Sequence, residues 1–252
     1  MEAFVKTNIE NRLATIVFFH PAQNSLPGVI LSQLAQQIQE CGINPAVDLV
    51  LVKSDGEKSF CAGASFDELA NIEDLSSGQQ FFSGFANVIL AIRNCPVPII
   101  GRIHGKAIGG GVGLAAAMDY AIASQYASIR LSELAVGIGP FVIGPVVERK
   151  MGLAAFQKMA LSPAEWQTAQ WAKDKGLYTE VFDSIEQLDR YLEHFIQTLL
   201  TYNPEALRQL KKIFWEDCPS WDQKLLERAA ISGRLVLSDF SKNAIAAFKK
   251  KS

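Results

Sequence analysis

A run of glycines is the feature of this sequence that most directly indicates chemistry. The stretch KAIGGGVGLAAAM, residues 106–118, places three consecutive glycines before small apolar residues. A glycine-rich turn that opens a helix brings unpaired backbone N–H groups and the positive end of the helix dipole to one point, which favours an anion. A second glycine-containing turn, SFCAGASFDEL, occupies residues 59–69. Together the two turns could hold a negative charge.

Three chemistries use such a turn. A P-loop is excluded, because no Gly-Lys-Ser or Gly-Lys-Thr follows the glycines. A dinucleotide-binding fingerprint fits the sequence better, because Gly111, Gly113 and Ala116 match its G-x-G-x-x-A spacing. Glu133 lies about 20 residues on, where an acid would meet the ribose. Such a fingerprint should follow a strand directly, whereas HGKAI separates the predicted strand from the glycines.

The third chemistry is an oxyanion hole, in which backbone N–H groups stabilise the charge that develops on a carbonyl oxygen. The start of one helix supplies one or two such donors. The turn at 59–69 could supply another. Close packing of a small-residue helix against a sheet would require the same glycines. The residues taken alone therefore leave the oxyanion hole and the packing explanation open.

The elements that must position these turns follow from the hydrophobic pattern, which interleaves strands and helices. The apolar runs predict strands over residues 13–19, 46–54, 95–105, 119–124 and 127–133, and helices over 26–41 and 76–95. From about residue 160 the pattern becomes helical. Ser162, followed by Pro163 and Glu165, has the composition of a helix start, and Ser184 and Asn203 begin similar segments.

Composition limits the class of protein. The chain has 252 residues, of which 49% are hydrophobic and 20% charged, as in a globular protein. A formal net charge of −2 gives no reason to expect nucleic acid or an anionic membrane as a partner. The four scattered cysteines show no metal-ligand spacing and are expected to be reduced thiols of a cytoplasmic protein. We expect no secretory signal and no membrane span.

The order of the motifs carries a resemblance to a known family. The segments that carry it are Asn24 in PAQNSL, SFCAGAS, PVPIIGRIHGKAIGGGVGLAAAMDYAIAS, LSELAVGIGP, AEWQTAQWAKDKGLYTEVF and NAIAAFKKK. With these the chain resembles the crotonase family, also called the enoyl-CoA hydratase/isomerase family, over nearly its whole length. The resemblance implies an α/β fold, a spiral of ββα units over 1–198. It also implies a C-terminal helical region, 199–252, that mediates homotrimers, often paired into hexamers.

The resemblance also implies an acyl-CoA substrate whose thioester oxygen is held by the backbone N–H groups of Ala64 and Gly110. Hydratases of the family share the acid and base work between two glutamates. Glu133 matches one of them, and Gly113 stands where the other would fall. Phe141 stands near the position of a different acid, used by dienoyl isomerases and dehalogenases. A single carboxylate favours a proton shuttle that moves a double bond, as in the family's enoyl-CoA isomerases.

Other readings of the same motifs remain open. Glu133 could hold a water for hydration of a straight or branched enoyl-CoA, and decarboxylation of a malonyl-type thioester needs mainly the oxyanion hole. The missing acid also permits a catalytically inactive binding subunit. No metal and no cofactor beyond the coenzyme A of the substrate are expected. The expected substrate contacts are Asn24, Cys61 and Ala62 near the nucleotide, Phe141 of GPFVIG (139–144) near the acyl group, and Phe248 and Lys249 near the adenine and 3′-phosphate.

Overall fold

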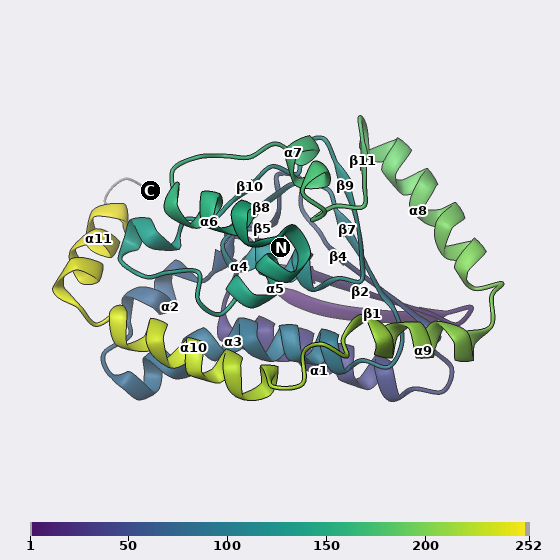
Figure 1. Cartoon of the computed structure of the whole chain (residues 1–252), viewed down its shortest axis with the longest axis horizontal. Coiled ribbons are helices and arrows are strands. Elements are labelled where there is room, and N and C mark those ends of the chain that lie inside the picture. The colour runs from purple at the N-terminus through teal and green to yellow at the C-terminus, as the bar shows by residue number, and fades with distance from the viewer. Residues whose placement is uncertain (1, 250–252) are drawn as a thin grey trace.

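The centre of the molecule is a six-stranded sheet (Figure 1). The computed structural model describes residues 2–249, with side chains described for 2–247. The sheet has the order β1 (Phe4–Glu10), β2 (Leu13–Phe19), β4 (Leu49–Ser54), β7 (Ile99–Ile103), β9 (Tyr120–Ser124) and β11 (Glu180–Phe182). Strands β1 and β2 form an antiparallel hairpin, and every later neighbour in the sheet is parallel.

Two smaller sheets carry the segments that the sequence marks for chemistry. The first contains β10 (Ile129–Arg130), β8 (Lys106–Ile108) and β5 (Ser59–Cys61), all parallel, and the second pairs β3 (Ser25–Leu26) with β6 (Gly63–Ala64). Each of β4, β7 and β9 is followed along the chain by one strand of the three-stranded sheet. This repetition of two strands and a helical segment is the expected spiral of ββα units.

Helices cover both faces of the main sheet. In chain order they are α1 (Gly28–Ile43), α2 (Phe66–Ala70), α3 (Leu75–Asn94), α4 (Gly110–Ala117), the 3-10 turn Glu133–Val136, α5 (Gly144–Met151), α6 (Leu153–Leu161), α7 (Ala169–Asp174), α8 (Ile185–Leu199), α9 (Pro204–Phe214), α10 (Trp221–Leu235) and α11 (Asp239–Lys249). Within residues 2–249, no helix combines the length and the apolar character that a membrane crossing requires.

The alternation of side chains along β4 shows how both faces are filled. Val50 and Val52 enter the main core, which includes residues of α1 and α3, whereas Leu49 and Leu51 pack in a second cluster with residues of α8. Successive side chains of a strand point to opposite faces, so a strand that is apolar throughout must be covered twice. Figure 1 accordingly shows α8 across the sheet from α1 and α3.

Most of the predicted elements are present, and one predicted helix start is wrong. Strands and helices occupy the predicted segments, although the strand expected over 127–133 is reduced to Ile129–Arg130. Ser162 ends α6 instead of starting a helix, and Thr168 caps α7. The backbone of Gln167 pairs with Ile129 instead of joining a helix. The two residues exchange two backbone hydrogen bonds of 2.9 Å, which hold the chain extended at Gln167, just before α7. Ser184 and Asn203 are N-caps, as predicted.

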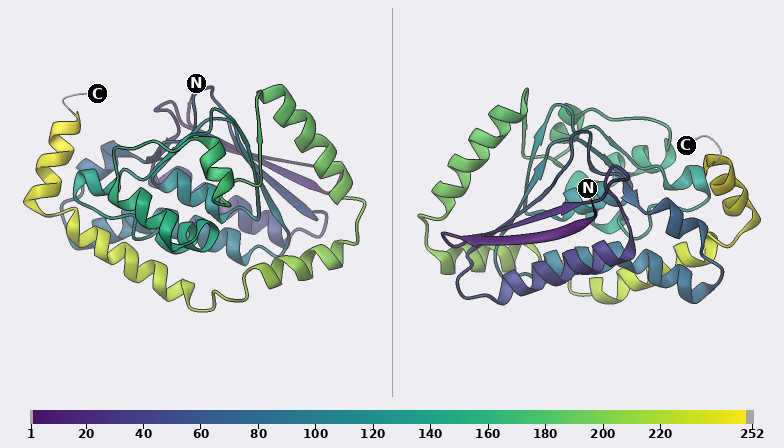
Figure 2. Two further views of the ribbon diagram at one scale, coloured as in Figure 1. Left: turned by 45° about the horizontal axis from the view of Figure 1, so that its top comes forward. Right: turned by 180° about the vertical axis from the view of Figure 1, so that it is seen from behind.

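The C-terminal helices follow the outside of the helical layer (Figure 2). Helix α10 runs against α3 at a point where Gly78 and Gly233 meet, since a Cβ added to Gly78 would lie 2.8 Å from the Gly233 carbonyl oxygen. Gly233 adjoins Ser232, so this close crossing brings α10 to the region of the site described below. The division of the chain at residues 198 and 199 stays a prediction.

A buried ion pair fastens α9 to the sheet. The Asp119 carboxylate, at the start of β9, accepts hydrogen bonds from the Ile99 N–H at 2.7 Å, from Lys211 Nζ at 2.8 Å and from Trp215 Nε1 at 2.9 Å. The side chains of Lys211 and Asp119 are 2% and 4% exposed. A buried charge pair of this kind becomes costly when one partner is removed, because the other charge stays desolvated.

We predict that Lys211→Ala destabilises the protein by about 3–5 kcal/mol, since Asp119 would remain buried without its cation. Urea denaturation followed by circular dichroism measures the change. The neighbouring exposed residue provides the control, and Lys212→Ala should alter the unfolding free energy by less than about 0.5 kcal/mol. Equal effects of the two substitutions would contradict the assignment of this anchor.

Candidate active site

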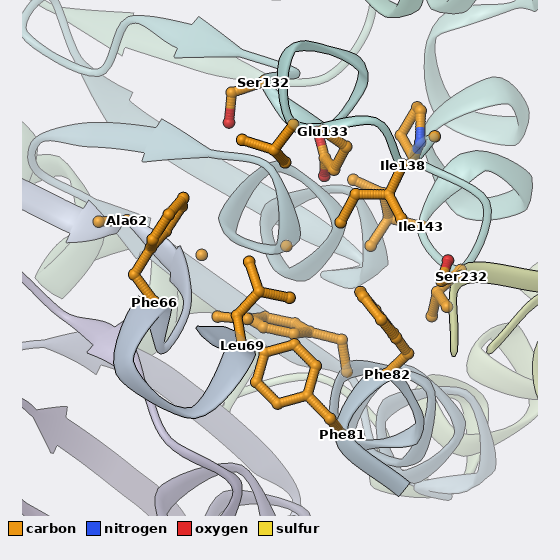
Figure 3. Close-up of a pocket in the computed structure, with 18 residues that line it drawn as sticks. Ala62, Phe66, Leu69, Phe81, Phe82, Ser132, Glu133, Ile138, Ile143 and Ser232 are labelled. Carbon is orange, nitrogen blue, oxygen red and sulfur yellow. The ribbon is translucent and has the colours of Figure 1, made fainter. Parts of the chain in front are cut away.

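A cavity of about 110 Å³ lies between α2, α3, α4, the 3-10 turn and α10 (Figure 3). Its wall is almost entirely apolar. The lining side chains of this kind include Phe66, Leu69, Phe81, Phe82, Phe85, Val136, Ile138, Pro140, Val142 and Ile143. The backbone of Gly63, Ala64 and Gly110 forms part of the same wall. The structure thus brings both glycine turns to one apolar pocket.

The start of α4 carries no side chains, because neighbouring groups occupy the space that a Cβ would need. Gly109 has φ +52°, and a Cβ there would lie 2.8 Å from Glu133 Oε1. A Cβ on Gly110 would lie 2.5 Å from the Phe85 ring. The Gly109 N–H donates to the Arg130 carbonyl at 2.9 Å, which ties this turn to β10. The Gly110 N–H belongs to the first turn of α4, where N–H groups have no partner within the helix.

The second turn lies against this helix start. Gly63 has φ +91°, and a Cβ there would be 3.0 Å from the Ile108 carbonyl oxygen and 3.7 Å from the Gly110 nitrogen. Neighbouring backbone groups fix the turn: the Ala62 N–H donates to Asn24 O at 3.0 Å and the Ser65 N–H to Leu26 O at 2.9 Å. Ala64 and Gly110 therefore stand next to one another in the cavity wall.

Glu133 is the only ionisable residue among the described residues that line this cavity. It begins the 3-10 turn that follows β10, and Figure 3 shows its side chain at the pocket. Its Oε2 is buried and has no hydrogen-bond partner among residues 2–247. Burial raises the pKa of the carboxyl from 4.5 to about 7, against the opposing effect of the backbone N–H groups of Glu133 and Ser132. Such a group can both take and return a proton near neutral pH.

The space beside Gly113, where the family resemblance would place a second acid, is filled by Ile143. A Cβ added to Gly113 would lie 2.3 Å from Ile143 Cγ2 and 2.6 Å from Ile143 Cβ. Ile143 is buried at the start of α5 and lines the cavity. Packing against Ile143 therefore requires glycine at residue 113.

Ala62 lines the cavity, whereas Asn24 and Cys61 are not among its lining residues. The Asn24 side chain is used internally: its Nδ2 donates to the carbonyls of Asp55 and Ser59, and its Oδ1 accepts from the His20 N–H at 2.7 Å. Cys61 is fully buried, and burial raises the pKa of its thiol to about 12. All four cysteines are free and buried.

The other predicted contacts lie elsewhere. Gly139, Pro140, Val142 and Ile143 of the GPFVIG segment line the first cavity, but Phe141 lines a second one of about 640 Å³. Gly139 and Pro140 line both cavities. The backbone of α11 extends to Lys249, whereas the side chains of Phe248 and Lys249 lie outside the described residues.

Several lining residues were not identified from the sequence. Ser132 and Ser232 supply hydroxyl groups, and Phe81, Phe82 and Phe85 come from α3. The spacing of the three phenylalanines puts them on one side of a helix, which is a detectable signal. Ser232 has no such signal, because only the crossing of α10 over α3 brings it to the cavity.

Comparisons with known proteins agree with this architecture. Residues 8–251 match the family model described as enoyl-CoA hydratase/isomerase. A probable enoyl-CoA hydratase of Bacillus subtilis (strain 168) is 26% identical over 249 residues, or 96% of this chain and 94% of the relative. The peroxisomal Delta(3,5)-Delta(2,4)-dienoyl-CoA isomerase of Arabidopsis thaliana is 25% identical over 260 residues, or 96% and 92%.

Solved structures show the same fold. The crystal structure of an enoyl-CoA hydratase from Mycobacterium avium matches with a TM-score of 0.87 and 26% identity, and the match covers 100% of this chain and 98% of that one. The parallel spiral and the cavity at the start of α4 define a crotonase-fold protein. The chain belongs to the enoyl-CoA hydratase/isomerase family.

We predict that Gly113→Ala destabilises the protein. The 2.3 Å approach to Ile143 places the packing penalty at the upper end of about 1–3 kcal/mol, which exceeds the gain of about 1 kcal/mol from alanine in a helix. Denaturant unfolding measures the difference. In an Ile143→Gly background the penalty should shrink, because both the Cγ2 and the Cβ contacts are gone.

The control for this prediction is Gly28→Ala, at the start of α1. An added Cβ there meets nothing closer than 3.6 Å, so the substitution should be neutral or stabilising. A penalty for Gly113→Ala that is the same with and without Ile143 would show that the two residues do not compete for this space.

Glu133 should also limit stability above neutral pH. The pKa of Glu133 is about 7 in the folded protein and 4.5 in its ordinary state, which the unfolded chain resembles. The contribution of the protonated carboxyl to folding stability is therefore complete below pH 4.5 and is lost as pH rises through 7. We predict that Glu133→Gln is more stable than the wild type by about 3 kcal/mol at pH 8 and by much less at pH 5. Urea midpoints at the two pH values measure this gap, and a gap that does not depend on pH would contradict it.

Proposed function

We propose that this protein is an acyl-CoA enzyme that moves the double bond of an enoyl-CoA thioester, with Glu133 as the single acid and base. The observation that carries the proposal is one buried carboxylate in an apolar cavity, with Ile143 closing the place where a second carboxylate would stand. Coenzyme A enters as part of the substrate.

The chemistry follows from the positions of three groups. The Glu133 carboxylate removes a proton from C2 of a 3-enoyl thioester, and the C–H electron pair forms the C1–C2 double bond of a dienolate. The N–H groups of Ala64 and Gly110 donate to the thioester oxygen, on which the charge develops. When the oxygen lone pair re-forms the carbonyl, the C1–C2 π pair moves to C2–C3, and the C3–C4 π pair forms the new C–H bond at C4 with the proton that Glu133 returns. The carboxylate is restored, and no co-reactant is consumed.

The electrostatics of the site support this role. The positive end of α4 faces the developing oxyanion, so its charge is stabilised in the intermediate more than in the neutral substrate. A pKa near 7 lets one carboxyl act as base and then as acid without a large cost in either direction. A carboxylate oxygen that is buried without a hydrogen-bond partner, as Oε2 is, is costly to keep, which argues against an inactive binding subunit.

Other reactions of the fold fit the cavity less well. Hydration would need a second group to activate water, and the remaining polar side chains in the wall are the neutral hydroxyls of Ser132 and Ser232. Decarboxylation would place a substrate carboxylate near Glu133, where two like charges repel one another. The family as a whole includes hydratases and isomerases, so assays of both reactions separate these possibilities.

A homotrimer, or a hexamer built from trimers, remains part of the proposal. Large apolar side chains stand exposed on α6 and α9 among the described residues: Leu153, Leu161, Leu210, Ile213 and Phe214. Leu210, Ile213 and Phe214 lie three and four residues apart on α9 and therefore share one face of that helix, and an exposed apolar face often marks a contact between subunits.

We predict that Glu133→Gln lowers kcat/KM for 3-enoyl-CoA isomerisation by about 10²–10⁴-fold, which is the usual contribution of general acid and base catalysis. In the wild type, kcat/KM should rise with pH and level off above a midpoint near 7, because the carboxylate form starts the reaction. The assay follows the absorbance of the conjugated thioester as it forms.

The matched control is Glu165→Gln, since Glu165 is exposed and lies outside the cavity. It should keep the wild-type rate. Full activity of Glu133→Gln would refute the proposal. Faster loss of absorbance from crotonyl-CoA than gain from 3-enoyl-CoA would assign hydration instead.

A further inference from the structure

The cavity has two distinguishable ends (Figure 3). Ala62 and Phe66 lie on one side of Glu133 and Leu69, and Phe82, Ser232 and Ile138 lie on the other. Ala64 and Gly110 hold the thioester under the proposed function, and Ala62 lies two residues before Ala64. The end at Phe82 and Ser232 is therefore the end that the tail of the acyl group would reach.

This far end is closed by packing. Helix α10 cannot move away from α3 without breaking the contact of Gly78 with Gly233, whose backbones meet directly. The adjacent Ser232 is 1% exposed. Phe82 makes an edge-to-face contact with Phe81 at 5.0 Å between ring centroids, which fixes its orientation. A longer acyl chain would have to displace one of these groups.

The size of the cavity indicates the length of the chain. Its volume is about 110 Å³, compared with about 150 Å³ for an apolar protein cavity that binds one benzene molecule. A tail that fills the space holds fewer atoms than a six-carbon ring. With the carbonyl carbon and C2 placed beside Ala64 and Gly110, this corresponds to an acyl group of about six carbons at most.

The polarity of the wall indicates the charge of the tail. Among the described lining residues there is no Lys, Arg or His, and the one ionisable group is the acid Glu133. A second carboxylate at the end of the acyl chain would lose its hydration without gaining a cation, which is costly. A hydroxyl partner such as Ser232 would not offset a full charge.

We infer that the substrate is a short, uncharged acyl thioester, and that Phe82 and Ser232 form the wall that sets its length. This inference rests on the proposed function, because it uses the thioester position between Ala64 and Gly110. It adds a substrate class and assigns two residues that determine specificity.

The test uses binding of saturated acyl-CoA thioesters, which need no turnover. Calorimetry on the wild type should show affinity rising about fourfold for each added methylene from butyryl to hexanoyl, followed by a fall at octanoyl. Glutaryl-CoA, which carries a carboxylate, should bind at least tenfold more weakly than pentanoyl-CoA of the same length.

Two variants should move the limit in opposite directions. Phe82→Ala opens the end wall, so the rise in affinity should continue to octanoyl. Ser232→Val narrows the wall, so hexanoyl should bind at least tenfold more weakly than butyryl. Phe66→Ala removes the same atoms from the opposite end, and it should weaken all chain lengths alike without moving the optimum.

The outcomes separate this inference from the function on which it rests. Failure of every acyl-CoA to bind more tightly than free coenzyme A would overturn both. A wild-type preference that rises through octanoyl, or equal binding of glutaryl and pentanoyl thioesters, would overturn the inference and leave the isomerase proposal intact. If the acyl chain length that binds most tightly is unchanged in both Phe82→Ala and Ser232→Val, these residues do not set the length limit.

Discussion

The contact between the start of α4 and its surroundings is the constraint on which the rest of the site depends. Gly109 meets the Glu133 carboxylate, Gly110 meets the Phe85 ring, and a Cβ on Gly111 would lie 2.2 Å from the Cys61 carbonyl oxygen. No side chain fits on any of these three sides. The Gly110 backbone is therefore exposed to the cavity, and the Glu133 carboxyl stands beside the same turn.

The spiral arrangement explains how distant parts of the chain meet there. Strands β8 and β10 are parallel neighbours, so the segments that leave them, Gly109 and the Ser132–Glu133 turn, emerge at the same edge. The hydrogen bond from Gly109 to Arg130 locks that relation. Strand β5 lies on the other side of β8 and delivers Gly63 and Ala64 in the same way.

The sequence allowed the backbone parts of this site to be predicted better than its cavity. Glycine patterns are local, and the order of the two turns and Glu133 indicated a family. Phe82, Ile143 and Ser232 meet only through tertiary packing, which a single sequence does not reveal. The wrong helix start at Ser162 has a similar cause, because its capping residues compete with the pairing of Gln167 and Ile129. The same limit applies to Phe141, whose neighbours enter one cavity while its own ring enters another.

The Glu133 carboxyl, whose Oε2 is buried, connects folding stability with the proposed reaction. Its raised pKa arises from desolvation, so the group is maintained at the expense of folding stability above neutral pH. Ile143 contributes to both effects, since it keeps the cavity apolar and occupies the space that a side chain on Gly113 would need. A glutamate at residue 113 would have to displace Ile143 as well as replace a glycine. Core packing thus leaves no room for a second carboxylate at residue 113 while Ile143 keeps its place, which is the structural basis of the proposed one-base reaction.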